Sequence, residues 1–229
     1  MLNKSLSICM LLCIGLDSAN AGFIETDWQE VGDGKATLHE ETGIEWLNVS
    51  ETSGLSVNEA LAQTVDGGIY EGWRLPSFEE VDNWWRSILA GNYILTLGEG
   101  HIIDDSNYGE TAKAWMEANG LHDTIQARSY GIGLTSDGDY GFWGVSRVND
   151  NTRYRYGAYE YTANTTHTYA GVFLVSDGGL TLSSTEDPTL NASNPNAPIN
   201  QVPEPSMLAL MALGSLGLFG AGARRRKQS

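Results

Sequence analysis

Apolar segments at the two ends of the chain limit how much of it can fold as a globular domain. The uncharged run Met207–Ala223 is followed by Arg224, Arg225, Arg226 and Lys227, and an apolar core, Leu6–Leu16, follows Lys4. The carboxyl-terminal run has about 17 residues, the lower limit for a helix that crosses a hydrocarbon core. Its cations favour the cytoplasmic side of a membrane. We therefore expect a transmembrane helix over 207–223, with the folded part between the two ends.

The amino-terminal segment, 1–21, has the pattern of a signal peptide. Ala19 and Ala21 supply the small residues that signal peptidase requires before the cleavage point at Gly22. We expect export, with signal peptidase as a partner. The chain has two cysteines, Cys9 and Cys13, and both lie in this leader. The mature protein would therefore lack disulfides, cysteine catalysis and cysteine metal sites.

A proline-acid motif stands before the carboxyl-terminal apolar run. It consists of Val202, Pro203, Glu204 and Pro205. Motif, apolar span and basic end follow in this order over 202–229, and the arrangement resembles the PEP-CTERM sorting signal of Gram-negative bacteria. The resemblance implies an inner-membrane precursor anchored through 207–223, an exosortase that removes the tail, and delivery to the cell surface or extracellular matrix. An ordinary carboxyl-terminal anchor is the alternative.

The remaining chain is strongly acidic. The formal net charge is −16, and removal of both ends takes away five of the 13 basic residues but one of the 29 acidic ones, which leaves about −20. This charge disfavours nucleic acid and anionic membrane surfaces as partners. It favours solubility and cation binding, although a solvated acidic surface is the preferred explanation. Residues 183–201 are rich in Ser, Thr, Asn and Pro, so we expect a flexible stalk there.

Helix-start signals lie in the first half of the domain, 22–182. The capping box Ser56–Glu59 predicts a helix over Val57–Val65. A second box, Ser77–Glu80, predicts a helix that ends before Gly91 and is buried on its tryptophan side. Thr111–Asn119 predicts a third.

Strand signals dominate the second half. Segments rich in aromatic and branched residues there predict strands at Ser129–Leu134, Tyr140–Val148, Thr152–Tyr161 and Tyr169–Ser176. In the first half, Ala36–Leu38 and Ile44–Asn48 are two further strand candidates. Polar turn residues separate them, so the pairing should be antiparallel. The sequence therefore predicts an α+β domain.

The segment Gly32–Leu89 carries a family resemblance. Thr42–Leu47, an alanine-containing helix, and the string Trp73-Arg74-Leu75-Pro76 before a helix start resemble the Lcl C-terminal domain family and, more distantly, C-type lectin-like folds. The resemblance implies a lectin-like domain with two or three short helices and an antiparallel sheet. Trp73 and Leu75 should fill the core, Pro76 should set the helix start, and Arg74 could bridge a buried carboxylate.

Aromatic residues of the second half are the candidate ligand contacts. These residues alternate with polar ones, so some rings should lie on an exposed sheet face and stack on sugars. They are Trp143, Tyr154, Tyr156, Tyr159, Tyr161 and Tyr169. A tyrosine-rich core is the alternative.

Two short groups of polar residues are possible calcium ligands. The sugar-binding lectins use a Trp-Asn-Asp group for calcium, of which Asn149 and Asp150 remain here, and Asp137-Gly138-Asp139 is either a ligand group or a turn. The histidines show no metal-ligand spacing, so we expect no metal site.

No catalytic motif is visible. We expect a non-enzymatic protein that binds extracellular polysaccharide or another matrix component. A secreted glycan hydrolase that uses a pair such as Glu79 and Glu80 or Asp104 and Asp105 is one alternative. A structural matrix protein without a ligand is the other.

Overall fold

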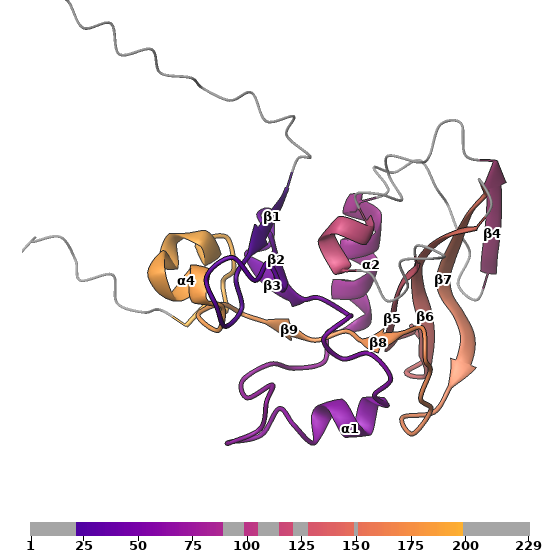
Figure 1. Cartoon of the computed structure of the whole chain (residues 1–229), viewed down its shortest axis with the longest axis horizontal. Helices are drawn as coiled ribbons and strands as arrows, with labels where there is room; N and C mark the ends of the chain where they lie inside the picture. The colour runs from indigo at the N-terminus through magenta and orange to yellow at the C-terminus, as the bar shows by residue number, and fades with distance from the viewer. Residues whose placement is uncertain (1–21, 89–98, 105–114, 121–127, 149–150, 199–229) are drawn as a thin grey trace, which may run out of the picture.

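Two sheets face each other across a central helix (Figure 1). The structure is a computed structural model that describes residues 22–88, 99–104, 115–120, 128–148 and 151–198. The central helix is α2, Phe78–Ile88. The predicted α+β class is confirmed.

The smaller sheet joins the two ends of the domain. Its strands are β1 (Phe23–Thr26), β2 (Ala36–His39), β3 (Ile44–Leu47) and β9 (Val175–Ser176). They pair in this order, and every pairing is antiparallel. The sequence predicted β2, β3 and β9 but not β1. The partner of β3 on its second edge therefore comes from the far end of the domain.

The larger sheet holds the aromatic strands. It runs in the order β4 (Glu99–Asp104), β7 (Asn151–Tyr161), β6 (Tyr140–Val148), β5 (Arg128–Leu134) and β8 (Gly171–Val172). Strand β8 is parallel to β5, and the other pairings are antiparallel. Strand β4 was not predicted. The short segment that contains β8 and β9 passes from one sheet to the other (Figure 1).

The helix starts form as the capping boxes predict. In α1, Val57–Leu61, Ser56 Oγ accepts from the Glu59 amide while the Glu59 carboxylate accepts from the Ser56 amide. This helix stops short of Val65, because the Gln63 and Thr64 amides donate to carbonyls three residues back, those of Ala60 and Leu61, in turns instead of the α-helical pattern. In α2, Ser77 and Glu80 make the same reciprocal bonds. Residues 115–119 are also helical, and the earlier part of that predicted helix lies outside the described residues.

Two consecutive tryptophans of α2 face different sheets. The Trp84 ring stacks on Trp46 of the smaller sheet, with centroids 4.7 Å apart and 8° between the planes. The Trp85 ring lies 6.4 Å from Trp143 and 6.3 Å from Tyr154, both in the larger sheet. All of these rings are almost fully buried. The predicted burial of the tryptophan side of α2 is confirmed, and α2 supplies the core shared by both sheets.

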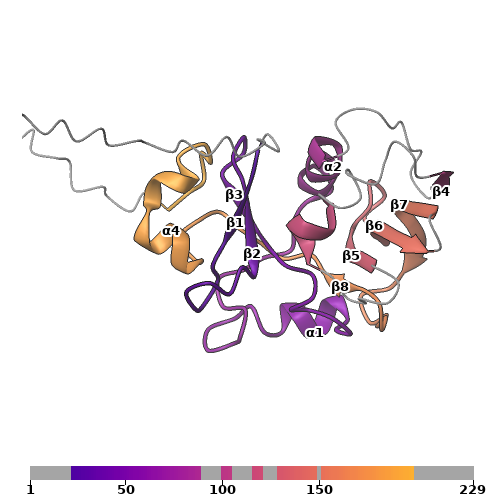
Figure 2. The same ribbon diagram turned by 45° about the horizontal axis from the view of Figure 1, so that its top comes forward.

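Residues 183–198 are folded, so the prediction of a stalk that begins at Ser183 is wrong for them. Helix α4, Leu182–Glu186, and the 3-10 helix η1, Pro188–Asn191, contact the smaller sheet on the side away from α2 (Figures 1 and 2). Hydroxyl and amide side chains take the place of apolar ones there: Thr181 is fully buried and donates to Glu45 Oε1 at 2.6 Å. Such groups can be buried because they are hydrogen-bonded. Residues 199–201 lie outside the described residues.

Candidate functional site

Three of the aromatic residues proposed as ligand contacts lie in the core. Trp143 and Tyr154 have 0% of their surface exposed, and Tyr156 has 4%. They point to the face of the larger sheet that α2 covers, so the prediction that these three rings stack on sugars is wrong. The alternative of a tyrosine-rich core describes them. Asn149 and Asp150 lie outside the described residues.

The opposite face of the larger sheet carries a second aromatic group. Side chains alternate along a strand, so Phe142 points away from α2 when Trp143 points toward it. The Phe142 ring makes edge contacts with Tyr130 at 5.4 Å and Tyr161 at 4.9 Å. The Tyr130 hydroxyl donates to Ser146 Oγ at 2.7 Å, which anchors the ring on the sheet.

The loop after β7 extends this aromatic group to the surface. The His167 ring lies 4.8 Å from Phe142 and 5.6 Å from Tyr169, and the Tyr169 amide donates to His167 Nδ1 at 3.2 Å. Tyr169 is 43% exposed, and the guanidinium carbon of Arg128 lies 4.2 Å from its ring centroid. We call this group the Arg128 surface. Its members are Arg128, Tyr130, Phe142, Tyr161, His167 and Tyr169.

The surroundings of the Arg128 charge differ from those of three other described cations. Lys35, Arg74 and Arg86 each form an ion pair with a carboxylate, whereas Arg128 pairs with no carboxylate of the residues that the structure describes. Burial, aided by the nearby positive charge of Arg128, lowers the pKa of His167. The imidazole is therefore neutral at pH 7, and the bond from Tyr169 leaves its proton on Nε2.

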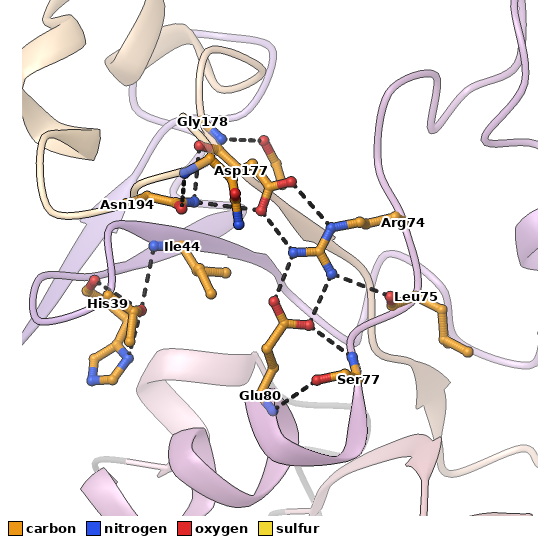
Figure 3. A network of polar contacts seen from close by, with 12 residues as sticks. His39, Ile44, Arg74, Leu75, Ser77, Glu80, Asp177, Gly178 and Asn194 are labelled. Carbon is orange, nitrogen blue, oxygen red and sulfur yellow. Dashed lines mark hydrogen bonds and ion pairs between the residues drawn. The ribbon is translucent and has the colours of Figure 1, made fainter. Parts of the chain in front are cut away.

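Arg74 is the centre of a polar network that is structural (Figure 3). Its guanidinium donates to both oxygens of Glu80, at 2.8 and 2.7 Å, and also to Asp177, whose backbone carbonyl accepts from the Asn194 amide side chain. The expectation that Arg74 bridges carboxylates is confirmed, although they are partly exposed. Each charge is satisfied inside the network, so it offers no free group to a ligand.

The other residues of the fold motif have the predicted structural places. Trp73 is 3% exposed, Pro76 is buried, and Leu75 is partly buried against the same core. The backbone of Arg74 pairs with Val175 in both directions, at 2.9 and 2.8 Å. The motif therefore connects the start of α2 to the last strand.

The candidate calcium group Asp137-Gly138-Asp139 gains no support from the structure. Asp137 and Asp139 flank an exposed turn in which the Gly138 amide donates to the Thr135 carbonyl. No group of three potential metal-ligating side chains occurs in the described part of the chain.

The carboxyl-terminal region of the chain matches a known protein family. Residues 201–227 match the family described as the PEP-CTERM protein-sorting motif. The chain carries a PEP-CTERM motif. This motif indicates a secreted protein that an exosortase sorts from a membrane-anchored precursor. No curated protein and no solved structure matches the chain.

The PEP-CTERM residues themselves lie outside the described residues. These are Val202, Pro203, Glu204, Pro205, Arg224, Arg225, Arg226 and Lys227, and the predicted helix 207–223 and the leader with Ala19 and Ala21 lie outside as well. Within the described ranges, no helix has the length and apolar character needed to cross a bilayer. Gly22 is described, and its carbonyl accepts from the Glu40 amide at 2.8 Å.

Sequence reasoning missed Arg128 and His167 as site residues. One signal could have found Arg128: it stands directly before the predicted strand Ser129–Leu134 and two residues before Tyr130, so the two share a sheet face if the strand begins one residue earlier, as β5 does. His167 has no such signal because it lies in a loop.

Proposed function

We propose that this protein is a non-enzymatic cell-surface or matrix protein of a Gram-negative bacterium, whose folded domain binds extracellular polysaccharide. The observation that carries the proposal is the exposed ring of Tyr169 at the edge of the Arg128 surface. Aromatic rings with one accessible face stack on the apolar faces of sugars. The PEP-CTERM motif supports the location, because it indicates export.

We also propose that the domain is C-type lectin-like. The support is the sequence resemblance over Gly32–Leu89, together with the α+β arrangement in which β9 returns to the amino-terminal sheet. Calcium has no role in this proposal.

Absence of catalysis is part of the proposal. A glycan hydrolase needs two carboxyl groups that face one substrate from either side. Glu80 is bound by Arg74 and by the Ser77 amide, and Glu79 faces solvent at the start of α2. Asp105 of the second candidate pair lies outside the described residues.

Binding can be tested with the full chain, solubilised in a detergent that carries no sugar. Titration calorimetry against a panel of defined polysaccharides should give heat with at least one of them. Tyr169→Ala should weaken that binding about tenfold, which corresponds to the loss of one ring contact. Val31→Ala, at a residue that is 84% exposed and belongs to another loop, should leave the affinity unchanged.

The calorimetry separates the alternatives. Absence of heat with every polysaccharide would favour a structural matrix protein without a ligand. Release of reducing ends during the titration would favour the hydrolase.

Removal of the tail can be tested separately. Mass spectrometry of the surface-associated protein, from cells with an active exosortase, should find no peptide from 224–229. Recovery of the intact carboxyl terminus there would contradict processing.

A further inference from the structure

We infer that the Arg128 surface takes an acidic polysaccharide, with Arg128 as the residue that recognises its carboxylate or sulfate groups. This inference rests on the proposed function and adds the class of ligand. The sequence alone does not suggest an acidic ligand, because the net charge of the domain is strongly negative.

The first argument is the state of the Arg128 charge. In so acidic a domain the other cations named above are neutralised by carboxylates 2.7 to 3.2 Å away. Arg128 forms no such pair with the described residues and lies on the Tyr169 ring instead. A guanidinium has five N–H donors in its plane, and contact with an aromatic face leaves these edges directed outward. The geometry suits a bidentate oxyanion.

The second argument is the ring beneath the guanidinium. Tyr169 is held from its backbone by His167 Nδ1, and His167 is held in turn by the edge contact with Phe142. The cation and the exposed ring are therefore positioned together. A sugar that carries an anionic substituent offers both complementary features, a C–H face for the ring and an oxyanion for the guanidinium.

The net negative charge does not exclude an acidic polymer. Charges separated by more than about 8 Å are largely screened at physiological ionic strength. Distant carboxylates slow the approach of a polyanion, while the affinity depends on groups in contact with it.

A matched pair of polymers tests the inference with the full chain. Polygalacturonate and its methyl ester share one backbone and differ in charge, and dextran sulfate and dextran form the same comparison for sulfate. The protein should bind at least one acidic polymer about tenfold more tightly than its neutral counterpart. The pair that shows this preference identifies whether Arg128 recognises a carboxylate or a sulfate. Equal affinity for the neutral and acidic members of both pairs would overturn the inference and leave the proposed function intact. Failure of every polysaccharide in the panel to bind would overturn both.

Two variants locate the effect. Arg128→Gln should lower the affinity for the preferred acidic polymer to that of the neutral one and leave neutral binding within twofold. Tyr169→Ala should weaken both forms. Polyglutamate serves as a polyanion without sugar, and binding of polyglutamate as tight as that of the acidic polysaccharide would overturn recognition of a sugar. The comparison of unmodified protein with the two polymer pairs stands even if a variant fails to fold.

Discussion

Arg74 donates two hydrogen bonds to the carboxylate of Asp177, from Nε at 3.3 Å and from Nη2 at 2.7 Å, across 103 residues of sequence. The same guanidinium binds Glu80 in the first turn of α2. These bonds join the segment before the central helix to the end of the last strand. The string Trp73-Arg74-Leu75-Pro76 therefore connects the two halves of the domain.

Replacement of Arg74 should destabilise the domain. Arg74→Gln leaves two partly buried carboxylates close together without their cation, and we expect a loss of about 2 kcal/mol in the free energy of unfolding. Urea unfolding of the full chain measures it. Lys35→Gln is the control, because its pair with Glu51 is at the surface, where solvent screens it, and its loss should change the free energy of unfolding much less. Equal losses in the two variants would contradict a special role for Arg74.

The stacked tryptophan of α2 should be sensitive to a small change. Trp84→Phe removes the hydrogen bond from Nε1 to Asn119 Oδ1, which is 3.0 Å long and buried, and part of the contact with Trp46. We expect a loss of about 2 kcal/mol from the cavity and the unpaired oxygen together. Thermal or urea unfolding gives the value. The exposed change Val31→Ala should stay within about 0.5 kcal/mol, and a similar result for Trp84→Phe would show that the core adapts.

Stability should fall as the pH is lowered through the range where histidines titrate. Burial lowers the pKa of His39 below its usual value of 6.5, against the weaker opposing effect of Glu41. Between the folded and unfolded pKa values the unfolded chain binds more protons, so the free energy of unfolding rises with pH. The stabilisation is complete above about pH 6.5 and is lost below it until the folded pKa is reached.

Urea unfolding at a series of pH values from 8 to 5 tests this dependence. His39→Gln should flatten the slope, and the remaining slope should include a contribution from His167, whose pKa burial also lowers. The same slope in protein and variant would contradict a neutral His39.

Gly43 should tolerate no side chain, because the carboxyl-terminal segment lies against it. Its φ is +65°, and a Cβ would approach the Asn194 nitrogen to 2.6 Å. Gly54 is the matched control, with φ of +78° and no atom within 4 Å of its Cβ position. Gly54→Ala should cost about 1 kcal/mol from backbone strain alone. Gly43→Ala should cost about twice as much and make 182–198 accessible to protease.

Limited proteolysis followed by mass spectrometry reads out this segment. Cleavage within 182–198 at equal rates in both glycine variants and in the unmodified protein would mean that the segment does not depend on its contact with Gly43.

Local chemistry made much of this fold predictable. The boxes at Ser56 and Ser77 start helices because a side-chain oxygen and a carboxylate satisfy amides only a few residues away. Strands β5, β6 and β7 of the larger sheet follow from alternation and branched residues within each segment, whereas β4 was not predicted. Neither signal depends on distant parts of the chain. The short edge strand β1 was missed because its pairing comes entirely from β2.

The sequence by itself determined the PEP-CTERM motif, the helix starts, most strands and the structural role of the Trp73–Pro76 string. Only the tertiary structure decided which face of the larger sheet is covered. Alternation assigns Trp143 and Phe142 to opposite faces but cannot say where α2 lies, so the buried tyrosines were mistaken for ligand contacts. Tertiary contacts also decided that residues 183–198 fold. Their polar side chains bury little apolar surface, and hydrogen-bond partners such as Asp27, for Ser183, and Gly43, for Asn191, lie more than a hundred residues away.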